Sequence, residues 1–142
     1  MDWRTHLATR LAALRPAHLY ALDAEAHDFA TACLPGTPIL TADAPTAAGA
    51  LALGIAALDA LDAEAARHLI HRVRLYVAPR LLLAAQADGP LDDDAFRALG
   101  FECELRDPAD GTHIQAYDLA TYKPVPDWLN ARFWAHPERW EP

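Results

Sequence analysis

The stretch that decides the fold is residues 51–86, LALGIAALDALDAEAARHLIHRVRLYVAPRLLLAAQ. It opens with an almost wholly apolar run, residues 51–58, which is typical of a strand buried on both faces. A helix should follow, because Asp59 or Asp62 can cap its start. The apolar stripe expected on one face of that helix comprises Ala66, Leu69, Ile70, Val73 and Val77. A proline ends the helix, and a second buried strand is predicted over residues 80–85. Strand, crossover helix and strand predict a βαβ unit, the start of a parallel sheet.

The same alternation of strands and helices continues on both sides of this unit. The other predicted strands cover residues 18–23, 37–43, 101–106 and 112–119, and further helices are expected to begin near Trp3, Ala24 and Asp92. The last two strands are joined by Asp-Pro-Ala-Asp-Gly, which is typical of a hairpin connection and predicts antiparallel pairing. The sequence therefore predicts an α/β, Rossmann-like fold. Its mostly parallel sheet should contain about six strands flanked by helices, with an antiparallel hairpin near the C-terminus.

Length and charge limit the classes of protein that fit. The 142 residues predict a single domain, with a core over residues 17–120 and a C-terminal aromatic helical tail over residues 121–142. The formal net charge of −8 repels nucleic acid and anionic membranes. No apolar run approaches the roughly 20 residues that span a bilayer, and the N-terminus lacks the pattern of a signal peptide. We therefore expect a cytoplasmic protein that binds neither nucleic acid nor membrane.

Nucleophiles and metal ligands show no familiar spacing. Cys33 and Cys103 form no CxxC and no zinc-ligand pattern, so free, buried thiols are expected. The chain has no serine, which excludes a serine hydrolase. His68 and His71 could both reach one metal ion, but no carboxylate or cysteine stands at matching spacing. We interpret them as part of a solvent-facing basic surface with Arg67, Arg72 and Arg74. No metal site is predicted, because residues 92–94 fit a capped helix start better than a calcium loop.

The central stretch resembles the class I S-adenosylmethionine-dependent methyltransferases. The matching features are the apolar strand, the ALDALD turn, the helix ending VAPRLLLAA, and the sequence FRALGF at residues 96–101. The resemblance covers roughly residues 17–120 and implies Asp23, Glu25 and Asp43 as candidate cofactor-binding residues, with Asp43 in place of the acidic residue that grips the ribose. In that family the turn after the first strand is rich in glycine, whereas here it reads Asp-Ala-Glu-Ala. No cofactor is therefore predicted, except for S-adenosylmethionine if the domain is a working methyltransferase.

The C-terminal sequence is the second informative resemblance. Residues 117–134, YDLATYKPVPDWLNARFW, are similar to the tail of a group of short uncharacterised bacterial proteins, which implies shared ancestry and no known activity. Aromatic residues and arginine dominate binding hot spots, so Trp134, Trp140 and Arg132 are candidate contacts to a protein partner or a second copy. Trp128 and Phe133 are expected to pack on the domain as a clasp.

Three functions remain open, and the sequence identifies no catalytic residue. The first is a non-catalytic methyltransferase-like domain that acts through protein contacts. The second is a small-molecule binder that uses the crevice at the carboxyl ends of the parallel strands. The third is a methyltransferase with an atypical cofactor loop.

Overall fold

The strand–helix–strand unit predicted from residues 51–86 forms the middle of the fold. Its first strand, β3 (Leu51–Gly54), is buried throughout and pairs in parallel with β4 (Arg80–Gln86). Between them, α3 (Ala63–Tyr76) begins at Asp62, whose carboxylate accepts the backbone N–H of Ala65 at 2.8 Å. The predicted apolar stripe is confirmed: its members are buried, except for the half-buried Leu69.

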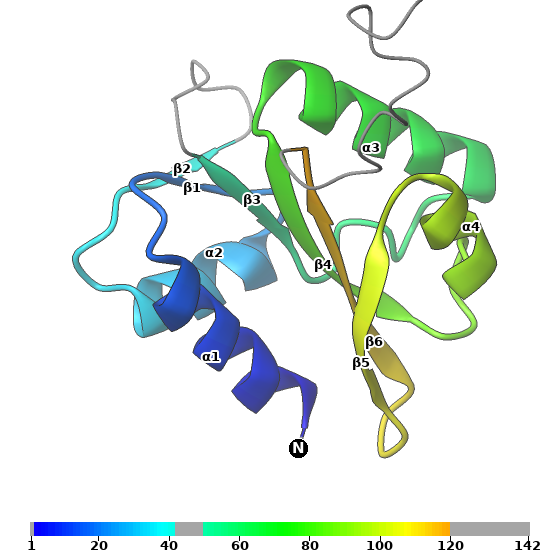
Figure 1. The fold of residues 1–142 in the computed structure, drawn as a ribbon, viewed down its shortest axis with the longest axis horizontal. Coiled ribbons are helices and arrows are strands. Elements are labelled where there is room, and N and C mark those ends of the chain that lie inside the picture. The colour runs from blue at the N-terminus through cyan, green and yellow to red at the C-terminus, as the bar shows by residue number, and fades with distance from the viewer. Residues whose placement is uncertain (1, 42–49, 120–142) are drawn as a thin grey trace, which may run out of the picture.

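The computed structural model describes residues 2–41 and 50–119, whose strands form one six-stranded sheet of order β2-β1-β3-β4-β6-β5 (Figure 1). The remaining elements are α1 (Trp3–Leu14), β1 (Leu19–Ala21), α2 (Ala24–Cys33), β2 (Ile39–Thr41), α4 (Asp93–Ala98), β5 (Glu102–Asp107) and β6 (Thr112–Asp118). β2, β1, β3 and β4 run parallel to one another. β6 is antiparallel to both β4 and β5, so the predicted hairpin is confirmed.

The sheet is mixed, and the prediction of a mostly parallel Rossmann-like sheet is wrong. The parallel strands β1 and β2 have three residues each, whereas β4 and β6 have seven residues each and pair along their whole length. The physical reason is the position of β6. It lies between β4 and β5, so it forms antiparallel ladders with both strands. If β6 lay at the edge, its pairing with β5 would be the hairpin's one antiparallel ladder.

Helices cover both faces of the sheet, α1 and α2 on one and α3 and α4 on the other (Figure 1). Side chains of β4 alternate between the two resulting cores, as strand geometry requires. Leu81 and Leu83 join the core under α3 and α4, whereas Leu82 and Ala84 join the core under α1 and α2. The hairpin shares both cores, because Tyr117 packs in the first and Ile114 in the second.

An aspartate caps the start of every helix that the structure describes. Asp2, Asp23, Asp62 and Asp92 each accept the backbone N–H of the residue three positions later. Such a cap typically stabilises a helix by about 1 kcal/mol relative to alanine. Part of the acidic composition therefore serves local structure, and Asp92 fills the capping role expected at residues 92–94.

Several predictions fall on parts of the chain outside the described residues. These are Asp43 as a cofactor ligand, the aromatic helical tail over residues 121–142, and within it Arg132, Trp134 and Trp140 as partner contacts. The expected clasp formed by Trp128 and Phe133 lies there too. Among the described helices, none combines the length and the apolar character needed to cross a membrane.

Candidate functional site

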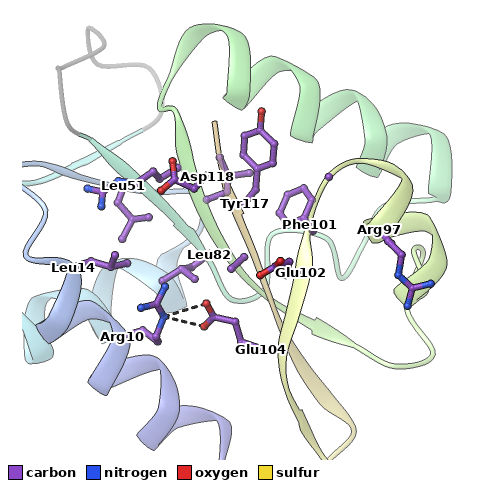
Figure 2. Close-up of a pocket in the computed structure, with 14 residues that line it drawn as sticks. Arg10, Leu14, Leu51, Leu82, Arg97, Phe101, Glu102, Glu104, Tyr117 and Asp118 are labelled. Carbon is purple, nitrogen blue, oxygen red and sulfur yellow. Dashed lines mark hydrogen bonds and ion pairs between the residues drawn. The ribbon is translucent and has the colours of Figure 1, made fainter. Parts of the chain in front are cut away.

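The candidate site is a cavity of about 420 Å³ between α1 and the β5–β6 hairpin (Figure 2). It lies at the amino ends of β3 and β4, where Leu51 and Arg80 begin these strands. Because β6 runs antiparallel to β4, its last residues, Tyr117 and Asp118, reach the same end of the sheet. The antiparallel insertion that makes the sheet mixed thus brings the carboxyl end of β6 to this cavity.

The lining of the cavity combines an apolar part with charges of both signs. The half-buried Leu14 of α1 supplies apolar surface, and the buried side chains of Leu51 of β3 and Leu82 of β4 lie behind it. The charged lining side chains are Arg10, Arg80, Arg97, Glu102, Glu104 and Asp118. Such a lining suits a ligand that has an apolar body and opposite charges of its own.

The ion pair between Arg10 and Glu104 is the best-defined polar feature of this cavity (Figure 2). Arg10 Nε donates to the two carboxylate oxygens of Glu104 at 3.0 and 3.1 Å, and His6 Nε2 lies 2.9 Å from one of them. The β5–β6 register shifts between Cys103 and Leu105, which makes Glu104 the extra residue of a bulge. Leu105 then packs in the core under α1, and Glu104 still reaches the same helix.

Aromatic rings form the part of the cavity nearest to α3. The centroids of Phe101 and Tyr117 lie 5.4 Å apart, and the guanidinium of Arg74 lies 4.6 Å from the centre of the Tyr117 ring. Arg74 also donates to the backbone carbonyl of Leu99. The prediction that Arg74 faces solvent is therefore wrong, because the corner between α4 and β5 comes within its reach. The other four members of that basic surface are exposed as expected.

Asp23 and Glu25, the two predicted cofactor-binding residues that the structure describes, lie away from this cavity. Asp23 stands at the carboxyl end of β1, where its two carboxylate oxygens accept the backbone N–H groups of Ala26 and Ile55 at 2.9 and 2.8 Å. It thereby ties the start of α2 to the end of β3. Glu25 is exposed in the first turn of α2. At the end of β3, an added Cβ on Gly54 would lie 2.7 Å from Leu83 Cδ2, so the backbone there is closely packed.

A second polar cluster lies on the other face of the hairpin, below α4. One oxygen of Asp93 accepts from Gln115 Nε2 at 2.8 Å and lies 2.9 Å from His113 Nδ1, while the other accepts from Arg106 Nε at 2.8 Å. The hydrogen bond with His113 holds the pKa of Asp93 below its ordinary value. Ligand atoms of Asp93, Cys103 and His113 all lie within 4.8 Å of one another, so these three residues could hold a metal ion.

The two cysteines are free and half-buried, which confirms free thiols but not full burial. Burial raises the pKa of both thiols. For Cys103 the nearby carboxylate of Asp93 acts in the same direction. Sequence reasoning missed the neighbours of this thiol because α4, β5 and β6 meet only in the folded chain.

These features define an α/β domain with a mixed sheet, a charged cavity at one end of its strands and a polar cluster beside its hairpin. The chain belongs to a family of unknown function, DUF6231, whose model matches residues 1–142. Neither the curated proteins nor the solved structures include a match to this chain.

Proposed function

We propose that this protein is a binding domain that holds a small zwitterionic molecule with an apolar body, such as a free amino acid, in the cavity between α1 and the hairpin. The observation that carries the proposal is the lining of this cavity, which combines leucine side chains with guanidinium and carboxylate groups. Its volume of about 420 Å³ lies within the range of ordinary small-molecule sites.

The charges around the cavity match the two ends of such a ligand. A guanidinium group binds a carboxylate through paired N–H donors, and Arg10 uses only Nε toward other described residues. Its terminal nitrogens therefore remain available to a ligand carboxylate. Glu102 lines the same cavity and accepts hydrogen bonds, as an ammonium group requires.

The ion pair with Glu104 holds Arg10 in place before any ligand arrives. The side chains of Arg10 and Glu104 are 34% and 20% exposed, so this pair is partly shielded from water. Fixing a recognition group in advance lowers the entropy cost of binding. Burial of the ligand's apolar body, in part against the half-buried Leu14, would supply the remaining driving force, at about 25 cal/mol per Å².

Backbone amide NMR during titration with leucine tests this proposal. Leucine should cause saturable shifts at residues around the cavity, and N-acetylleucine and 3-methylbutylamine, which each lack one charge, should cause much weaker ones. The variant Leu14→Trp should abolish the shifts, because an indole ring would fill the cavity. The matched variant Leu75→Trp, on the exposed side of α3, should leave them unchanged. Absence of saturable shifts with leucine and other apolar amino acids, or shifts that survive in Leu14→Trp, would exclude this function.

A second candidate function is the non-catalytic methyltransferase-like domain that acts through protein contacts, here with a second copy of the chain. It is favoured by Leu75 and Leu119, which are 72% and 57% exposed. Leu119 donates its backbone N–H to Pro79 just beyond α3, so apolar surface gathers at this end of the helix.

Sedimentation equilibrium tests the second candidate. The protein should dimerise, and Leu75→Glu should shift the equilibrium toward the monomer because a carboxylate would have to be buried in the contact. Addition of S-adenosylmethionine should leave the unfolding temperature unchanged, since Asp23 is engaged by backbone N–H groups. A strictly monomeric protein would argue against this candidate, and stabilisation by S-adenosylmethionine would favour a working methyltransferase.

A further inference from the structure

We propose that Asp93, Cys103 and His113 form a binding site for a divalent transition-metal ion of the zinc type. A thiol, an imidazole and a carboxylate come together here from α4, β5 and β6, although the proposed ligand cavity lies elsewhere. These are the three ligand types that zinc takes in proteins. The site is independent of the cavity between α1 and the hairpin.

The spacing of the donor atoms fits this ion after small side-chain adjustments. The donor atoms lie within 4.8 Å of one another. Tetrahedral zinc, with ligand distances of about 2.0–2.3 Å, requires donor atoms roughly 3.3–3.8 Å apart. The 2.9 Å contact between His113 Nδ1 and Asp93 would have to lengthen slightly, and rotation of side chains would have to bring more distant donor atoms together. Three protein ligands leave the fourth position to water or to another small ligand.

The strand register places these side chains on one face of the hairpin. Cys103 pairs with Gln115, and Arg106 pairs with His113. Residues 113 and 115 are two apart on β6, so their side chains point to the same side of the sheet. Because of the bulge at Glu104, the side chain of Cys103 lies on the same face as His113 and Gln115. The side chains of Glu104 and Leu105 lie on the opposite face, toward α1.

A second shell around the three ligands is already present. Gln115 is 1% exposed, and its amide donates to Asp93 at 2.8 Å, which would orient the carboxylate toward an ion. Arg106 also donates to Asp93, but its side chain is 57% exposed and can turn toward solvent. A divalent ion would then replace the charge of Arg106, and it would be balanced by the carboxylate and by the thiolate of Cys103.

Metal binding at this site must release a proton. The Cys103 thiol loses its proton to solvent as the metal–sulfur bond forms, and His113 binds through a neutral ring nitrogen. The affinity should therefore fall as the pH is lowered.

Titration of the full chain with Co²⁺ tests the site. Cobalt takes tetrahedral zinc sites, and a cobalt–thiolate bond gives a charge-transfer absorption that aspartate and histidine alone do not. We expect one equivalent of Co²⁺ to produce this band, and one equivalent of Zn²⁺ to remove it by displacement. The variant Cys103→Ser should lose the band, and His113→Ala should weaken binding of both ions. Circular dichroism of the metal-free variants checks that they fold.

The chain supplies matched controls for both ligand types. Cys33 is the other half-buried thiol, and Cys33→Ser should retain the band. His71 is exposed on α3, and His71→Ala should bind Co²⁺ as the unmodified protein does. Absence of a charge-transfer band in the unmodified protein would overturn the proposal. A band that survives in Cys103→Ser, or one lost in Cys33→Ser, would overturn it equally.

Discussion

Replacement of Phe96 by alanine should lower the free energy of unfolding by about 3–5 kcal/mol, the usual cost of removing a buried aromatic side chain. Phe96 is 1% exposed and is the main anchor of α4 on the sheet. Its ring meets Phe101 edge to face, with centroids 5.3 Å apart, and Phe101 in turn contacts Tyr117. Because α4 is short and is held on the hairpin, it cannot shift to fill the cavity that the substitution leaves. Urea unfolding followed by circular dichroism measures the loss.

The matched control is Thr31→Ala on α2. Thr31 is exposed, so its truncation should change the unfolding free energy by no more than about 0.5 kcal/mol. A similar loss in both variants would mean that α4 is not anchored through Phe96.

Replacement of Asp107 by alanine should lower the free energy of unfolding by about 1–3 kcal/mol, the usual cost of leaving one buried donor, here the backbone N–H of Trp3, without an acceptor. Asp107 ends β5 and is 5% exposed. One carboxylate oxygen accepts the backbone N–H of Trp3 at 2.9 Å, and the other accepts that of Ala109 at the same distance. The side chain thus joins the start of α1 to the hairpin turn. Hydrogen exchange should show faster opening at Trp3 and in the turn, along with the lower global stability.

Two variants separate the hydrogen bonds of Asp107 from a general effect of charge. Asp107→Asn keeps an acceptor oxygen and should lose less stability than Asp107→Ala. Asp88→Ala removes one carboxylate from an exposed loop residue and should be nearly neutral. If Asp88→Ala were as damaging as Asp107→Ala, the buried connection to Trp3 would not be the cause.

Local signals in the sequence were enough to predict most elements. Asp62 as a cap, the apolar stripe through Ile70 and Val73, and the turn after β5 depend on neighbours a few residues away. The direction of pairing across the whole sheet is a different kind of property. Whether β6 lies beside β4 or at the edge of the sheet depends on long-range packing. No local sequence pattern in residues 101–119 indicates which of the two positions it takes.

The candidate sites could not be predicted for the same reason. Arg10 and Glu104 are separated by 94 positions, and neither stands in a motif. Asp93 was interpreted as part of a helix start, and Cys103 as a buried thiol; both descriptions are local and leave out His113. Asp23, in contrast, was a candidate cofactor-binding residue implied by the resemblance to the methyltransferases, and the structure shows it as the cap of α2.

The bulge at Glu104 also bears on how the protein avoids aggregation. β5 forms one edge of the sheet, and a flat edge strand is a template on which a strand from another molecule can add. The register shift breaks the regular spacing of backbone groups along β5, and Glu102, Glu104 and Arg106 place charges there. An incoming strand would find no continuous, uncharged ladder to extend. Growth of a sheet across molecules is therefore disfavoured at this edge, so a high concentration of the folded chain is less prone to form fibres through β5.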